Sequence, residues 1–239
     1  MRILGWADPG CVCENLPMEL DHVMRTTFAC REFTDEAMPD DVLYDILEVA
    51  RFSPSGGNRQ GQRVIVVRDR ELRHRLAELC KPPMATYMAQ VQMGEAPWNT
   101  IVPSRVEADA VDRATFSSPF LDSLVGVPVL LVVCVDLSVV ASFDRDLDRV
   151  GVVSGASVYP FVHNILLAAR NAGYGGVITT SLANREREAQ QLLGLPRHVA
   201  IGALVPLGRP VKQLTKLRRR PVEEFTTIDR LDGPAFTGR

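Results

Sequence analysis

Residues 53–60 form a segment whose composition suits ligand binding. The segment contains Ser-Pro-Ser-Gly-Gly-Asn-Arg-Gln, with Gly56 and Gly57 at its centre. Because glycine has no Cβ, the backbone there can approach a ligand closely, and its amide groups can bind an anion or a carbonyl edge. The same composition is also typical of a plain surface loop, so this segment alone leaves both interpretations open.

A second candidate is the basic run at residues 216–220, which contains Lys-Leu-Arg-Arg-Arg and precedes a proline. A guanidinium group can bind a phosphate through two parallel hydrogen bonds. Such a run also occurs as a solvated charged edge. Nucleic-acid binding would require a broader basic face with interleaved aromatic residues, which the sequence lacks. A local phosphate site is therefore the functional alternative.

The sequence lacks the other usual patterns of catalytic and ligand-binding residues. The glycines at 173–176 precede an expected strand, whereas a dinucleotide fingerprint requires Gly-x-Gly-x-x-Gly between a strand and a helix. The five cysteines are too sparse for a disulfide framework, and Cys11-x-Cys13 has no second pair with which to bind zinc. The four histidines form no metal-binding pair. We expect no metal site, no catalytic triad and no catalytic carboxylate pair.

The elements that must position these segments alternate between helical and extended periodicity. A helix is predicted to follow Pro39, because apolar residues then recur every three or four positions, and to end before Pro54. A short strand at residues 64–67 is followed by a helix that carries Leu72, Leu76 and Leu79.

The second half of the chain continues this alternation. Residues 127–135 are apolar on both faces, which is typical of a central strand covered on both sides. A long helix is predicted over residues 154–171 despite Pro160, with Gly173 as its stop signal. Strands at 177–179 and 199–205 then flank a helix that Asn184 caps and Gly194 ends. The pattern predicts an α+β or α/β sandwich.

The domain organisation follows from two stretches that lack periodicity. Residues 1–19 are interpreted as an N-terminal extension, and residues 20–239 as a single domain that ends in a C-terminal arm at 210–239. Residues 81–120, rich in proline, resemble an inserted lid, because loops this long in compact domains are usually functional or disordered. Trp98, Phe116 and Phe120 in this stretch either cover a ligand or pack as a satellite core.

Charge and hydropathy exclude several classes of function. The formal net charge is −2, from 27 basic and 29 acidic side chains, so no global field draws the protein to nucleic acid or an anionic membrane. The longest apolar run, residues 125–135, is about half of the roughly 20 residues that cross a bilayer. The N-terminus has no apolar h-region. We therefore expect a cytoplasmic protein with no nucleic-acid or membrane partner.

Taken together and in order, four segments resemble the nitroreductase family. Members typically open with Arg-Arg-Ser-x-Arg-x-Phe, continue with an Ala-Pro-Ser-Gly-Gly-Asn-x-Gln loop, and close with a basic segment that ends in proline. The corresponding segments here are residues 27–33, 53–60, 175–180 and 219–224. The resemblance extends roughly from residue 20 to residue 231.

This resemblance implies a fold, an assembly and a cofactor. The fold would be an α+β sandwich with a central mixed sheet flanked by helices, and a homodimer would hold FMN at two sites on the subunit interface, each lined by both chains. Arg31 would meet the N1 and O2 edge of the flavin and stabilise its reduced form. The other implied cofactor contacts are Pro54, Ser55, Asn58 and Gln60 in the loop, Thr179, Thr180 and Ser181 beside the ring, and Lys216, Arg218 and Arg219 at the phosphate.

The sequence departs from the family pattern just before Arg31. Thr27, Phe28 and Ala29 occupy the places of an arginine pair and a serine. Losing one bidentate guanidinium costs on the order of 2 kcal/mol, or about 30-fold in affinity. Arg25 lies close enough in sequence to compensate, and Thr27 stays among the expected cofactor contacts.

The implied function is reduction of a nitroaromatic, a quinone or a similar small electrophile by NADPH or NADH, in a ping-pong cycle through FMN. The cofactor carries the chemistry, so no protein acid or base is required. Phe28 and Ala29 motivate a first alternative, a divergent protein that binds or sequesters flavin without turnover. A second alternative is oxygen-dependent breakdown of the flavin, as in the flavin-destructase branch of the family.

Overall fold

The computed structural model describes residues 18–107 and 117–238 of the chain. Its sheet consists of β1 (Gln62–Val66), β2 (Val129–Asp136), β4 (Val199–Gly208) and β3 (Gly175–Gly176), in the order β1-β2-β4-β3. All three ladders are antiparallel. We expected a mixed sheet; within the described ranges, the only parallel pairing is the isolated bridge between Ala29 and Gly176.

The central strand β2 is buried along its whole length, as its apolar sequence predicts. Side chains alternate between the two faces of a strand. Leu131 and Val133 therefore pack toward α2 (Asp40–Ala50) and α6 (Tyr159–Asn171) on one face. On the other face Val132 contributes to a second core. A strand apolar on both faces thus requires a helical layer on each side.

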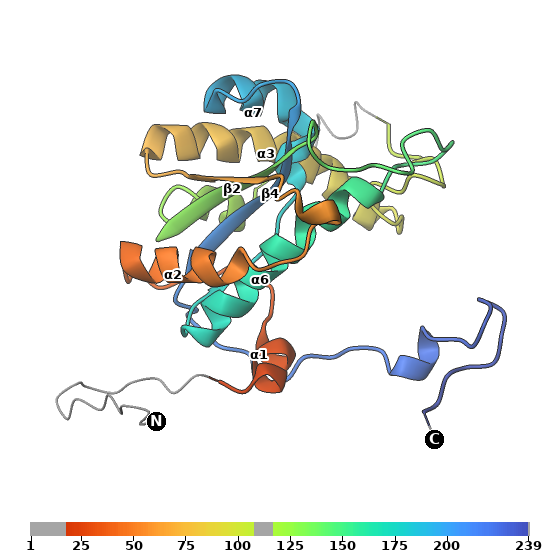
Figure 1. Ribbon diagram of the computed structural model, residues 1–239. Coiled ribbons are helices and arrows are strands. Elements are labelled where there is room, and N and C mark those ends of the chain that lie inside the picture. Colours follow the sequence, from red (N-terminus) through yellow and green to blue (C-terminus); the bar gives the residue numbers. More distant parts are fainter. Residues whose placement is uncertain (1–17, 108–116, 239) are drawn as a thin grey trace, which may run out of the picture.

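The second helical layer consists of α3 (Arg70–Gln92), α5 (Pro119–Ser123), α7 (Glu186–Leu193) and the 3-10 helix η3 (Ser181–Arg185). Figure 1 shows α3 and α7 above the sheet and α2 and α6 below it. The α+β sandwich is therefore confirmed. None of the described helices is both long and apolar enough to cross a lipid bilayer.

Helix α3 is longer than predicted. It continues to Gln92 through Pro82 and Pro83, so the expectation of an irregular stretch from residue 81 is wrong for residues 81–92. Proline removes a backbone hydrogen bond from a helix interior. Here the cost is offset by packing, because the second half of α3 buries Pro83 and Ala85 and the helix contacts α5 and η3. Tertiary contacts outweigh local propensity.

Helix α6 is shorter than predicted. It begins at Tyr159, and residues 153–157 form the separate 3-10 helix η2 (Val153–Ser157). Pro160 thus lies in the first turn, where its missing N–H costs no hydrogen bond. The helix stop at Gly173 is confirmed, because this residue has a φ of 81°.

Two boundaries after α6 also differ from the prediction. Strand β3 consists of Gly175 and Gly176 instead of residues 177–179, and Thr179 only forms an isolated bridge with Leu204. Asn184 lies within η3, and Arg185 is the residue that precedes α7. The end of α7 at Gly194 is confirmed, with a φ of 66°.

The segment at residues 29–34 links β3 to the start of the C-terminal arm. The backbone N–H of Cys30 donates to the carbonyl of Gly176 at 3.0 Å, and that of Thr34 donates to the carbonyl of Arg209 at 2.9 Å. Helix α1 (Leu20–Thr26) precedes this segment and contacts α6. The C-terminal arm, residues 210–238, extends away from the sandwich and contains the short η4 (Val222–Glu224) and an isolated antiparallel bridge between Thr227 and Ala235.

The close approach of β3 to β4 gives a stability prediction. A Cβ at Gly176 would lie 2.4 Å from Leu207 Cδ2 and 2.7 Å from the carbonyl oxygen of Pro206. Gly176→Ala should therefore destabilise the fold by about 2 kcal/mol, a fall in Tm of about 4–8 °C for a chain of this size. Thermal denaturation followed by circular dichroism measures the change.

Gly126→Ala is the matched control, because a Cβ at Gly126 would meet nothing closer than the carbonyl oxygen of Ser123 at 3.8 Å. It should melt within about 2 °C of the parent. Equal melting temperatures for Gly176→Ala and Gly126→Ala would contradict the steric explanation.

Candidate functional site

Arg31 is positioned by the pairing of its neighbours with β3. The parallel bridge at Ala29 and the hydrogen bond from Cys30 to Gly176 hold this segment extended, with Cys30 buried. Since side chains alternate along an extended segment, Arg31 points away from the face that buries Cys30. Its Nη1 donates to the carbonyl of Ala29 at 3.4 Å, and its guanidinium carbon lies 5.8 Å from the centre of the Phe120 ring.

The positive charge of Arg31 has no acidic partner among the residues that the structure describes. The side chain is exposed and faces a cavity of about 600 Å³. An unpaired guanidinium at the wall of a cavity is a ready site for an anion or for an electron-rich edge. We refer to this space as the Arg31 cavity.

The Arg31 cavity brings together segments that are far apart in the sequence. These segments are the one at residues 29–34, the second half of α3, the loop after α3, helix α5, the turn after β3, and η3. The lining residues are Arg31, Pro83, Met84, Tyr87, Pro97, Trp98, Phe120, Leu121, Ile178, Thr179, Thr180, Ser181 and Asn184. Arg31 is the only charged residue in this described lining.

The lining suits a flat ligand with one polar edge. Tyr87, Trp98 and Phe120 provide aromatic surface, and Arg31 with the hydroxyls of Thr179 and Ser181 provides polar groups. Ligand pockets commonly combine mostly apolar walls with a few convergent polar groups. The cavity volume also falls within the range of small-molecule sites, roughly 300–1,000 Å³.

A thiol lies behind the hydroxyl side of the cavity without contributing reactivity. Cys80 is fully buried, and burial raises its pKa to about 11, although a hydrogen bond with Ser181 opposes the shift. The sulfur is therefore a neutral thiol at physiological pH, and the thiolate is the nucleophilic form. Ser181 itself lies 3.4 Å from the hydroxyl of Thr179. Cys80 is also fully buried and absent from the cavity lining, so its sulfur is not placed to attack a ligand there.

The loop at residues 53–60 does not line this cavity. Its conformation is nevertheless well defined, because the N–H of Gln60 donates to Ser55 Oγ at 3.0 Å and the N–H of Asn58 donates to the Ser55 carbonyl at 2.9 Å. Asn58 and Gln60 both have positive φ, 52° and 50°, which is uncommon outside glycine. The loop is thus held in an unusual backbone conformation while most of its residues remain exposed.

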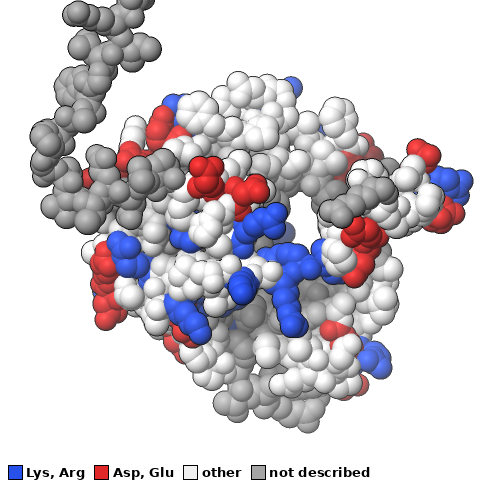
Figure 2. All heavy atoms as spheres, turned by 90° about the horizontal axis from the view of Figure 1, so that it is seen from below, with Lys and Arg blue, Asp and Glu red and all other residues white. Residues whose placement is uncertain are grey.

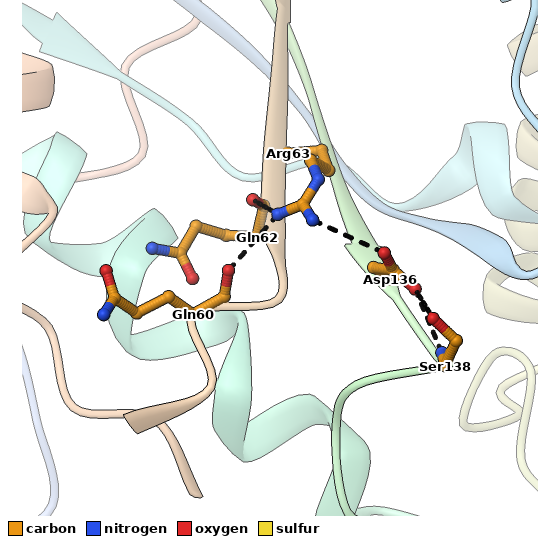
Figure 3. Close-up of polar contacts among 5 residues, drawn as sticks. All are labelled: Gln60, Gln62, Arg63, Asp136 and Ser138. Atoms are coloured by element: carbon orange, nitrogen blue, oxygen red, sulfur yellow. Dashed lines mark hydrogen bonds and ion pairs between the residues drawn. The ribbon is translucent and has the colours of Figure 1, made fainter. Parts of the chain in front are cut away.

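Arg63 fixes the end of this loop to the sheet (Figure 3). Its Nη1 donates to the carbonyls of Gln60 and Gln62, at 3.2 and 2.9 Å, and its Nη2 donates to Asp136 Oδ2 at 3.4 Å. Hydrogen bonds from Ser138 are the main cause that lowers the pKa of Asp136, with a smaller contribution from Arg63. Figure 3 shows the Gln60 and Gln62 amide groups pointing away from Arg63.

The basic residues of the C-terminal arm also lie outside the Arg31 cavity. Lys216, Arg218 and Arg219 follow the sandwich on the extended arm, and Arg219 Nη1 donates to the carbonyl of Arg218 at 2.7 Å. Figure 2 shows Lys and Arg side chains gathered on the face of the molecule that carries α1 and the arm in Figure 1. That face of the molecule is therefore basic. No residue of the C-terminal arm lines the Arg31 cavity of the same chain.

The residues that replace the arginine pair and serine of the family pattern offer few donors. The hydroxyl of Thr27 donates to the Val23 carbonyl at 2.8 Å, and Phe28 and Ala29 contribute no polar side-chain atom. Arg25 is exposed and 4.0 Å from Asp21. Neither Arg25 nor Thr27 lines the cavity. The cavity thus fits the ring portion of a flavin, whereas a phosphate would need donors from the loop or the arm.

Of the expected cofactor contacts, the structure brings together Arg31, Thr179, Thr180 and Ser181. Within one chain it does not bring to them Pro54, Ser55, Asn58, Gln60, Lys216, Arg218 or Arg219. Sequence reasoning missed Met84 and Tyr87, whose helical spacing was obscured by the prolines before them. Asn184 was predicted to cap the helix that ends at Gly194; it lies instead within η3 and lines the cavity.

Trp98, Phe116 and Phe120 were expected either to cover a ligand or to pack as a satellite core; Trp98 and Phe120 line the cavity, and Phe116 lies outside the described residues. Within 18–107 and 117–238, no three His, Cys, Asp or Glu side chains are grouped as metal ligands would be. Cys11 and Cys13 fall outside these ranges.

The chain is similar to flavoproteins of known structure and to curated relatives. An iodotyrosine deiodinase of Thermotoga neapolitana is 28% identical over 193 residues, which cover 80% of this chain and 89% of the relative. A putative NADH dehydrogenase/NAD(P)H nitroreductase of Methanothermobacter thermautotrophicus is 25% identical over 197 residues, 82% of this chain and 79% of that protein.

Among solved structures, oxidized iodotyrosine deiodinase bound to FMN and 3-iodo-L-tyrosine superposes with a TM-score of 0.61. The two chains are 24% identical, and the match covers 85% of this chain and 96% of the other. This likeness supports the fold described above. A family model described as the nitroreductase family matches residues 24–209, which is most of the described sandwich. The chain therefore belongs to the nitroreductase family.

Proposed function

We propose that this protein is an FMN-dependent reductase that takes electrons from NADPH or NADH and passes them to a small aromatic or quinone acceptor. The Arg31 cavity carries the proposal, because it joins one unpaired guanidinium, hydroxyl groups and aromatic walls in about 600 Å³. FMN, when bound, supplies the hydride and electron transfer. The protein then has to bind the cofactor, orient it and tune its potential, which agrees with a described cavity lining that contains no His, Cys, Lys, Asp or Glu to activate a hydroxyl group.

The proposed role of Arg31 is electrostatic. A fixed guanidinium favours the form of a bound ring that carries negative charge on its nearest edge. The extended segment at residues 29–31 is paired with β3, so Arg31 is anchored at its backbone. Thr179, Thr180 and Ser181 would lie along the same ligand and offer hydroxyl groups to its polar atoms.

We further propose that the working form is a homodimer in which two chains complete each site. The loop at residues 53–60 is held rigidly but contacts nothing in its own chain's cavity. The arm exposes large apolar side chains, with Phe225 60% and Leu231 95% exposed. Both features favour a second chain as the missing partner, which would bring donors of the loop and the arm to the phosphate end of FMN.

Reductive removal of a halogen from an aromatic ring is a second candidate function. It is favoured by the similarity to the iodotyrosine deiodinase of Thermotoga neapolitana. The donor pair NADPH and NADH is supported by the relative named as an NAD(P)H nitroreductase. Both reactions place an aromatic acceptor beside the cofactor, so the aromatic walls of the Arg31 cavity suit either.

The absorbance spectrum of the purified protein, recorded under nitrogen, tests this proposal. We expect flavin bands that NADPH or NADH bleaches and that a nitroaromatic or a quinone then restores. Recovery with 3-iodo-L-tyrosine and release of iodide would select dehalogenation. A colourless protein that rejects added FMN would refute the proposal, and a yellow protein that neither donor bleaches would indicate flavin storage. Loss of flavin during aerobic turnover would indicate flavin breakdown.

Arg31→Ala should lower the reduction potential of the bound flavin. A charge-assisted hydrogen bond contributes about 1.5–3 kcal/mol, which corresponds to roughly 30–60 mV for a two-electron couple. Spectroelectrochemistry measures the shift. Arg75→Ala is the control, because Arg75 is an exposed arginine of α3 that does not line the cavity. Equal potentials for the parent and Arg31→Ala would remove the proposed role.

A further inference from the structure

The loop after α3 is built around buried and half-buried polar groups. The side chain of Glu95 is 11% exposed, and its carboxylate accepts hydrogen bonds from Ser104 Oγ at 2.7 Å and from the N–H of Arg105 at 2.8 Å. These bonds lower the pKa of Glu95. The N–H of Glu95 donates to the Gln90 carbonyl at 2.9 Å. Residues 104 and 105 are thereby joined through Glu95 to the end of α3.

Trp98 lies within this loop in an uncommon backbone conformation. Its φ is 54°, in the left-handed region that bulky side chains rarely adopt. A residue held in that region marks a place where the surrounding structure imposes the conformation, and such residues cluster at ligand sites. We therefore expect a contact that stabilises the backbone of Trp98 in this conformation.

The side chain of Gln90 provides this contact. The residue is 7% exposed in the last turns of α3, and its side-chain Oε1 accepts a hydrogen bond from the N–H of Trp98 at 2.9 Å. A buried amide that accepts from a single backbone N–H fixes the position of that backbone closely. The hydrogen bond offsets the unfavourable φ of Trp98 and connects the loop to a rigid helix.

The indole of Trp98 is available to a ligand. It is 47% exposed and lines the Arg31 cavity together with Pro97 and Tyr87. A residue kept only for core packing would be buried, as Leu121 is at the same cavity. The indole therefore provides a flat surface on which an aromatic ring stacks.

We propose that Gln90 holds Trp98 as a preformed stacking wall, which makes the protein selective for flat aromatic acceptors over acceptors without an aromatic ring. Trp98 is the specificity-determining residue, and Gln90 is a positioning residue that acts through it. The inference rests on the proposed function, because it concerns the acceptor of that reaction. It adds the two residues that would select the aromatic acceptors named there.

Steady-state kinetics of four variants test the proposal. Trp98→Ala and Gln90→Met should raise the KM for nitrobenzene about tenfold with kcat within about twofold. Trp98→Phe keeps a ring and Gln90→Glu keeps an acceptor, so both should stay near the parent. The KM for ferricyanide, an acceptor without an aromatic ring, should rise far less than the KM for nitrobenzene in Trp98→Ala and Gln90→Met. Bleaching of the parent protein by NADPH is measured first, so failure of the proposed function shows separately from failure of this inference.

An equilibrium measurement covers the case without turnover. The sequence contains two tryptophans, so Trp6→Phe leaves Trp98 as the only indole. Nitrobenzene should quench its fluorescence saturably, with about tenfold weaker binding in Gln90→Met and parent-like binding in Gln90→Glu. Linear, unsaturable quenching, or equal affinity and equal KM in all variants, would overturn the proposal.

Discussion

The structure depends on the close contact of the glycine pair in β3 with its neighbours. Gly176 lies so near Leu207 and Pro206 that no side chain fits there, and Gly175 is similarly close to Cys30 and Pro210. This contact lets the segment before Arg31 hydrogen bond directly to β3. It therefore brings Arg31 beside Thr179 and Ser181, which follow β3 in the chain. Gly175 and Gly176, which have no side chains, thus allow the close packing that forms the candidate site.

Sequence patterns predicted those parts of the fold in which local and tertiary preferences agree. The apolar run of β2, the leucines of α3 and the left-handed glycines 173 and 194 all have the expected structure. The pattern failed where packing overrides local preference, as at Pro82 and Pro83 inside α3. It also failed at β3, because a pair of glycines carries no β-propensity and is selected by close approach alone.

The candidate site was partly predictable for a related reason. Arg31 and Thr179 to Ser181 were identified from motif order, and the sheet brings them together in one chain. Met84 and Tyr87 were missed because their helix was not predicted. For the loop at residues 53–60, the hydrogen bonds of Ser55 and Arg63 explain its backbone conformation, but they do not indicate which ligand it binds. Motif resemblance assigned the loop to the site, whereas within one chain the structure keeps it outside the Arg31 cavity.

The buried sulfur atoms bear on the chemical durability of the protein. Cys30, Cys80 and Cys134 are all free and buried, and burial raises the pKa of each thiol. Peroxides and alkylating agents attack thiolates far faster than thiols. Cys80 forms a hydrogen bond with Ser181, which lines the Arg31 cavity, yet Cys80 itself is fully buried and does not line that cavity. Among the residues that the structure describes, every cysteine is therefore in its less reactive protonated form, which favours resistance to oxidation and alkylation.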